Sequence, residues 1–391
     1  MIHLGIQYFN FNRILLLVIG LWPYQQSKVT RFQFLFLSTI LTAGIVFQLT
    51  PLMTSKHTSS NLVTKVLCST SFFTLAAIKY NLFWINIGAV KDLLMQLQHV
   101  HNQLKDKNEV AIIKEYNCIG RRYTITLTMF AVIFIFSYII SQYWMNVNVL
   151  PKNTSQLCRL PIMMEYFIDQ KKYFYLILLH INAIICIGLF ATVAIGTTLI
   201  AYVQHICGMF RIACYRIEHA ININIRNITL KNEVWMIKNV TYAVDIHRKA
   251  RKLSKHLTST IEKMIFFLIL CSVTCMALSM FQAFQVVSST KNIEELFLLS
   301  LFIVVIFSYM FIANYLGQNL TDHNNHVFFT AYNVQWYRAP LHVQRMILFL
   351  LQKESKKLTL NFGGLFDASM ECFATLVKTS VSYFTVMCSI R

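Results

Sequence analysis

The sequence contains little charge, little proline and little glycine. Charged residues make up only 13% of its 391 residues, whereas a soluble domain has about 25%. So few charges could not cover the surface of a soluble protein of this size. The 14% of aromatic residues excludes a disordered chain, and the 5 prolines and 11 glycines exclude long linkers rich in these residues.

Motifs for soluble chemistry are also missing. The ten cysteines include no CxxC pair and no zinc-ligand spacing, so they indicate neither a disulfide framework nor a metal site. The sequence has no HExxH, GxSxG or GxxxxGK[ST] motif. An enzyme is therefore the function class that the sequence favours least.

What the chain has instead is long apolar runs, since 56% of its residues are hydrophobic. Crossing the hydrocarbon core of a bilayer takes about 20 mostly apolar residues in a helix. Seven runs reach that length, which predicts an all-α, polytopic membrane protein with seven transmembrane helices. The runs are 32–53, 62–90, 123–149, 173–205, 261–287, 296–316 and 370–390.

The segments between the runs predict helical extensions of the membrane helices. The apolar run 14–22 is too short to span a bilayer and predicts an interfacial or re-entrant helix. Apolar residues recur at helical spacing in the long connections, which predicts amphipathic helices that pack together in the cytoplasm. The predicted regions are the N-terminal segment 1–31, helices one to four in 32–205, an extension in 206–260, helices five and six in 261–316, further extensions in 317–369, and helix seven in 370–391.

The distribution of basic residues predicts the orientation. Most of the 35 Lys and Arg lie before the first run or in the connections after the even-numbered runs. Basic loops stay in the cytoplasm, so we expect a cytoplasmic N-terminus and an external C-terminus. The formal net charge of +19 then reflects the cytoplasmic face and argues against nucleic acid as a partner. The sequon at Asn153 falls in an expected external loop and is a candidate glycosylation site.

Several polar residues suggest local roles. Lys79 lies inside the second run, where we expect its side chain to snorkel to the cytoplasmic surface. His99 and His101 lie in a basic amphipathic stretch and are expected to be solvated. His323 and His326 form an HxxH pair whose interpretation as a polar helix end is favoured over a metal site.

The outer halves of the runs contain scattered polar groups. His180 lies in the fourth run, and Ser137, Ser141 and Trp144 recur on one helical face of the third. Two interpretations remain open: bonds and packing between helices, or orienting groups in a mostly apolar ligand pocket.

The last run mixes hydroxyl and apolar residues, which is typical of a helix that lines water. Ser382, Thr385 and Ser389 are candidate pore-lining residues. Val386 and Ile390 share one helical face, so one copy from each subunit could form a hydrophobic constriction that gates a pore. Contact with lipid would account equally well for these two residues.

Together these features resemble insect odorant receptors, in particular the tuning receptors of ants and other Hymenoptera. The most specific match is KTSVSYFTV at 378–386. Supporting matches are YNVQWY at 332–337, QHICGMF at 204–210, and NRILL with GLWP at 12–16 and 20–23. Cys388 departs from the pattern, because many relatives have a basic residue there, and this puts the ion selectivity in doubt.

The resemblance implies an odorant-binding tuning subunit of a ligand-gated, non-selective cation channel. It implies assembly with a shared odorant coreceptor as a heterotetramer in the plasma membrane of olfactory neuron dendrites, with no cofactor. The gate positions match Val386 and Ile390. A volatile or long-chain hydrophobic ligand is expected in the outer part of helices two, three, four and six. Depth and helical face select the pocket candidates Phe72, Leu75, Ser137, Ser141, Trp144, His180, Ile184, Phe302, Val305 and Tyr309.

Three alternatives fit the sequence less well. A gustatory-type channel would end in a T-Y-x5-Q-F pattern, which is absent after Tyr383. A G-protein-coupled receptor would have the opposite orientation and an Asp-Arg-Tyr-like triplet after the third helix. A transporter would show broken helices and repeated halves, and neither is apparent.

Overall fold

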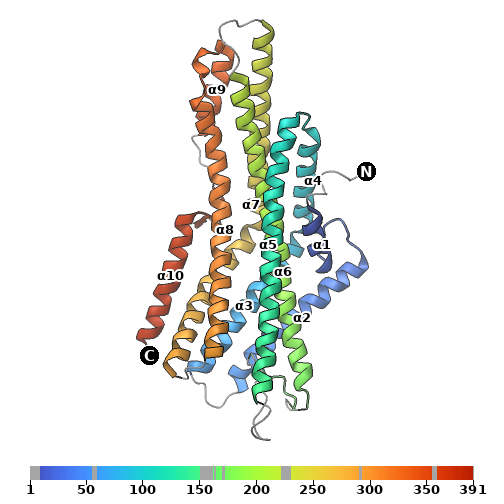
Figure 1. Cartoon of the computed structure of the whole chain (residues 1–391), viewed down its shortest axis with the longest axis vertical. Coiled ribbons are helices and arrows are strands. Elements are labelled where there is room, and N and C mark those ends of the chain that lie inside the picture. The colour runs from blue at the N-terminus through green and yellow to red at the C-terminus, as the bar shows by residue number, and fades with distance from the viewer. Residues whose placement is uncertain are drawn as a thin grey trace.

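The computed structural model describes residues 9–54, 60–149, 162, 164–169, 172–221, 230–289, 293–354 and 359–390. This part of the chain forms an elongated helical bundle with one short β-hairpin (Figure 1). The all-α membrane fold is as predicted. We call the end of the bundle where α10 terminates the lower end and the opposite end the upper end, as they are drawn in Figure 1.

Six of the described helices are long and apolar enough to cross a membrane, namely α2, α3, α5, α6, α7 and α8. The six agree with the first six predicted runs. The helices are α1 Asn10–Val18, α2 Lys28–Thr54, α3 Ser60–Ile85, α4 Ile87–Gln103, α5 Lys107–Val149, α6 Phe174–Ile221, α7 Leu230–Ser289, α8 Ile293–Asn333, α9 Leu341–Glu354 and α10 Met370–Ser389, with a 3₁₀ turn at Trp336–Arg338.

Four of these helices extend far beyond a bilayer. α5 has 43 residues, α6 has 48, α7 has 60 and α8 has 41. At about 1.5 Å per residue, even the shortest is about twice as long as the hydrocarbon core is thick. The described parts of the connections 206–260 and 317–369 therefore include continuations of α6, α7 and α8.

Helix α6 lies at the centre of the bundle because small residues let its neighbours approach. A Cβ on Gly188 would lie 3.2 Å from the Cβ of Ala76 in α3. A Cβ on Gly208 would lie 3.0 Å from Ile113 in α5. Small residues are what close helix packing in membranes requires.

A buried polar group joins three helices near the upper end. The Arg216 guanidinium in α6 forms an ion pair with Glu109 in α5, whose carboxylate is fully buried. Arg216 also donates a hydrogen bond of 2.8 Å to Asn239 of α7, and it stacks over Tyr242 at 4.3 Å. A buried ion pair needs such additional bonds to offset its desolvation.

The second predicted run, 62–90, is wrong at its C-terminal end. Helix α3 ends at Ile85, and α4 begins at Ile87 after a break at Asn86. The Asn86 side chain donates to the carbonyl of Leu82, one turn back. Such a side-chain bond to the backbone competes with regular helix geometry, so an Asn marks the break.

The β-hairpin leads the chain into α10. Strands β1 (Asn361–Phe362) and β2 (Phe366–Asp367) pair antiparallel. The turn between them requires glycine at Gly363 and Gly364, which have φ of 65° and 72°. The hairpin is held to α7 by a hydrogen bond from the Gly363 amide to Glu262.

Candidate functional site

Helix α10 presents an open face from Ser382 to Ile390. The exposed fractions of the Val386 and Ile390 side chains are 52% and 81%. Ser382, Thr385 and Ser389 are exposed as well. Their hydroxyls donate to the carbonyls of Lys378, Ser382 and Val386 in their own helix. The predicted gate and pore-lining residues therefore share one surface that this chain leaves uncovered.

The opposite face of α10 is attached to the bundle. Ser369 caps the helix, because its hydroxyl accepts a hydrogen bond from the Cys372 amide at 3.1 Å. Gly317 of α8 lets the incoming chain pass, since a Cβ there would lie 2.2 Å from the Cβ of Ala368. Near the lower end, Phe384 meets Phe284 of α7 edge to face.

Two of the predicted pocket residues contact one another directly. The rings of Phe72 in α3 and Phe302 in α8 are 4.8 Å apart. Leu75 packs with them against a buried cluster that includes Met276 and Met310. This group, Phe72, Leu75 and Phe302, is called the α3–α8 group below.

His180 and Ile184 have contacts toward α2. His180 Nδ1 is 2.7 Å from the hydroxyl of Tyr166, and its ring meets Phe47 of α2 edge to face. Ile184 is buried against Gly44, where a Cβ would lie 2.6 Å from Ile184 Cδ1. Sequence reasoning missed Tyr166, because it lies in a connection whose path only the fold shows.

The remaining pocket candidates have weaker contacts. Ser137 donates to the carbonyl of Phe134 in its own helix, and Ser141 and Val305 are half-buried. The side chain of Trp144 and the sequon residue Asn153 lie outside the described residues.

Lys79 does not snorkel to the surface, so that expectation is wrong. Its side chain is only 2% exposed. The ammonium donates a hydrogen bond of 3.0 Å to the carbonyl of Thr192 in α6 and lies 4.6 Å from the ring centre of Tyr309. Lys79 thereby joins α3, α6 and α8. The ring that the ammonium contacts in α8 belongs to Tyr309, which is a predicted pocket residue.

The histidines of the upper half differ from one another. His323 bonds to Tyr116 and to its own helix, and His326 lies 3.3 Å from Cys214 Sγ. No group of three or more metal-ligating side chains occurs in the described part of the chain. His99 is exposed as expected, whereas His101 is half-buried and lines a cavity, so it is only partly solvated.

The comparison with known families decides the class of protein. A profile of the 7tm odorant receptor family matches residues 59–381. The chain belongs to the insect odorant receptor family. It is therefore a multi-pass membrane protein of a family of ligand-gated channels, not an enzyme.

Individual relatives of the receptor are distant. The odorant receptor coreceptor of Aedes aegypti is 22% identical over 174 residues, which is 44% of this chain and 36% of that protein. Odorant receptor 9a of Drosophila melanogaster is 22% identical over 193 residues, 49% of this chain and 46% of that protein. These alignments therefore span less than half of the relatives' length.

Solved structures share the fold over the whole chain. The olfactory receptor OR5 of Machilis hrabei in complex with eugenol has a TM-score of 0.81 and 15% identity, with 100% of this chain and 99% of that chain covered. Another structure of the same receptor gives a TM-score of 0.74 at 16% identity.

Proposed function

We propose that the receptor is an odorant-binding tuning subunit of a heterotetrameric, non-selective cation channel that includes the shared coreceptor. The chain crosses the plasma membrane of an olfactory neuron dendrite seven times, with α10 as the seventh helix. The N-terminus is cytoplasmic, and the lower end of the bundle faces outward. The basic residues concentrated near the upper end support this orientation.

The observation that carries the proposal is the uncovered face of α10. Val386 and Ile390 are the exposed apolar residues nearest the end of this helix, next to Ser389. Several copies of this face around one axis would surround a narrow aqueous path. Val386 and Ile390 would close it by excluding water, and Ser382, Thr385 and Ser389 would line it when it is open.

The ligand binds in the lower half of α3, α5, α6 and α8. The α3–α8 group is the part of this region that supports the proposal best. Its apolar and aromatic side chains suit a volatile or long-chain ligand that is held by shape and dispersion. Eugenol, the ligand in the Machilis structure, is a reasonable first probe.

The channel opens because the ligand binds its open arrangement more tightly than its closed one. A ligand that fits the pocket better in the open arrangement increases the population of that arrangement. The α3–α8 group packs in one cluster with Leu376 of α10, so movement there reaches the pore helix through direct contacts.

Current recordings test the subunit role. Cells that express the receptor with the coreceptor should respond to some members of a panel of volatiles, eugenol and long-chain hydrocarbons. Cells that express either subunit alone serve as controls. A ligand-evoked current from the receptor alone would contradict the requirement for the coreceptor.

Substitutions in α10 test the gate. Val386→Ala and Ile390→Ala should raise the current without ligand or change the relative permeability to cations, because a smaller side chain weakens the constriction. Val46→Ala is the matched control, since Val46 lies on α2 and its side chain is as open as that of Val386. The gate assignment fails if Val386→Ala and Ile390→Ala leave both properties as in the unmodified channel.

A further inference from the structure

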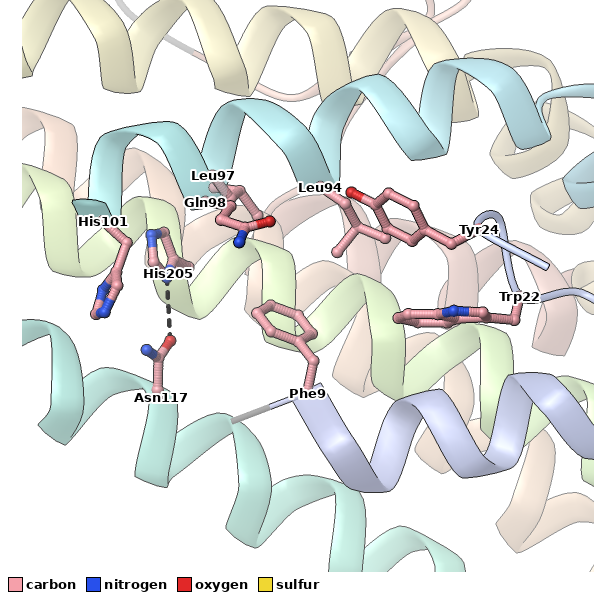
Figure 2. Close-up of a pocket in the computed structure, with 9 residues that line it drawn as sticks. All are labelled: Phe9, Trp22, Tyr24, Leu94, Leu97, Gln98, His101, Asn117 and His205. Carbon is pink, nitrogen blue, oxygen red and sulfur yellow. Dashed lines mark hydrogen bonds between the residues drawn. The ribbon is translucent and has the colours of Figure 1, made fainter. Parts of the chain in front are cut away.

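A cavity lies in the upper half of the molecule, between the N-terminal segment and helices α4, α5 and α6. Its volume is about 30 Å³, and Figure 2 shows the residues around it. Along α6, His205 at this cavity and His180 of the proposed odorant pocket are separated by about 38 Å, since helical residues rise about 1.5 Å each. The two sites are therefore separate.

The buried polar group of this cavity is His205, whose side chain is 3% exposed. Its Nδ1 lies 3.1 Å from Oδ1 of Asn117 in α5 (Figure 2). An amide oxygen only accepts hydrogen bonds, so Nδ1 carries the proton. Nε2 is then a bare acceptor. It has no hydrogen-bond partner among the described residues, although it is buried.

A second imidazole borders the same cavity. His101, in the last turn of α4, has a buried Nδ1 without a hydrogen-bond partner in the described part of the chain. Burial lowers the pKa of His101, which favours its neutral form. A neutral imidazole offers one donor and one acceptor.

The rest of the described lining is mostly apolar. Phe9 and Trp22 come from the N-terminal segment, and Leu94 and Leu97 come from α4 (Figure 2). No Asp or Glu is among the described residues that line the cavity. The described lining therefore has no anionic group to balance the charge of a cation, and a carboxylate anion could not donate a hydrogen bond to Nε2.

We propose that this cavity is a second ligand site, which binds a small neutral molecule with a hydroxyl group, such as a short aliphatic alcohol. The hydroxyl donates to His205 Nε2, and the carbon atoms pack on Phe9, Trp22 and Leu97. One water needs about 10–15 Å³ of such space, so the enclosed part takes a hydroxyl and one or two carbons. In the proposed orientation the site is reached from the cytoplasm.

Fluorine NMR tests the site directly. Trifluoroethanol is a strong hydrogen-bond donor whose hydroxyl and methylene carbon fit the enclosed part, and its methyl ether has the same fluorinated group without the donor. The full receptor, co-expressed with the coreceptor, is placed in lipid nanodiscs, and nanodiscs with the coreceptor alone provide the background. We expect a saturable shift with trifluoroethanol that exceeds this background, and none with the ether.

Variants locate the binding. His205→Leu removes the acceptor, and Leu97→Phe fills the cavity. Each should weaken binding of trifluoroethanol by about tenfold or more. His219→Leu is the matched control, because His219 lies exposed on the same helix. It should bind trifluoroethanol like the unmodified receptor.

The site is absent if the ether binds as well as the alcohol, if the shift does not saturate above background, or if His205→Leu and Leu97→Phe both bind normally. The donor and ether pair decides the question even if a variant fails to fold. The readout needs no channel current, so failure of the proposed channel function would leave this result intact.

Discussion

Helices α6 and α10 differ in where their stability comes from. α6 is buried along most of its 48 residues, whereas Leu376 and Ser380 are the buried residues of α10 within its described range. α6 is held by contacts inside the chain. α10 keeps one face free, so this face is covered by whatever surrounds the chain. The comparison separates a helix buried by its own chain from a helix with one face that the described chain leaves open.

The largest effect is expected from breaking the buried ion pair at the upper end of α6. Arg216→Ala leaves the Glu109 carboxylate buried without its cation, which should destabilise the receptor by about 3–5 kcal/mol. Thermal unfolding in detergent measures this loss. Arg248→Ala, which removes an exposed pair with Asp245, should cost less than about 1 kcal/mol. If both variants lost the same stability, burial would not be what makes the Arg216–Glu109 pair important.

A matched pair of isoleucines tests the comparison itself. Ile212 in α6 is fully buried, and Ile390 at the end of α10 is exposed. Ile212→Ala should destabilise the folded chain by about 2–5 kcal/mol, because it leaves a cavity. Ile390→Ala should change unfolding of the isolated chain by less than about 0.5 kcal/mol. A similar loss of stability in both would mean that α10 is buried within its own chain.

A smaller loss of stability is expected at the contact between α8 and the segment that leads into α10. Gly317→Ala places a methyl group against Ala368 and should cost about 1–3 kcal/mol through overpacking. The displaced hairpin would also shift the start of α10, so channel current should fall more than surface expression does. Gly88→Ala is the control, since a Cβ at Gly88 meets nothing within 4 Å. A normal current from Gly317→Ala would show that the α8 contact does not position α10.

Removing the N-terminal cap of α10 should destabilise the receptor less than Gly317→Ala does. Ser369→Ala removes the hydrogen bond to the Cys372 amide and should cost about 1 kcal/mol. Faster hydrogen exchange limited to the first turn of α10 would confirm it. Ser369→Asp, which can still cap, should keep the original protection. Unchanged exchange in Ser369→Ala would show that the cap is dispensable.

The smallest effect is the pH dependence from His101 in α4. Burial lowers the pKa of His101 below its ordinary value of 6.5. The unfolded chain then binds a proton that the folded chain resists, so stability is complete above pH 6.5 and decreases as the pH falls below it. His101→Gln should flatten this dependence in a thermal-unfolding series, and His99→Gln should not. If the stability of both variants depended on pH in the same way, His101 would not be its source.

Local sequence features account for much of the fold. The six predicted runs that recur as long apolar helices were visible because the need for about 20 apolar residues is a local property. The range of α10, 370–389, was also close to the predicted 370–390. Polar residues inside the runs were harder to place, because one helix alone does not show what each side chain meets.

The residues of the candidate site were also predicted only in part. The open face of α10 was visible as a mixture of hydroxyl and apolar residues. In contrast, Lys79 was expected to reach the surface and is buried, and His101 was expected to be solvated and is half-buried. The partner of Lys79 is the carbonyl of Thr192, 113 residues away along the chain. No spacing rule connects residues so far apart.

The sequence by itself determined the class of the protein: the apolar segments and their lengths, their helical form, and the asymmetric distribution of basic residues. These depend on the transfer of each segment between water and lipid, which is a sum over neighbouring residues. Only the tertiary structure decided that α6 is central, that α10 keeps one face free and that His205 borders a cavity. Burial depends on which helix surfaces meet, and those surfaces combine residues that are distant in the sequence.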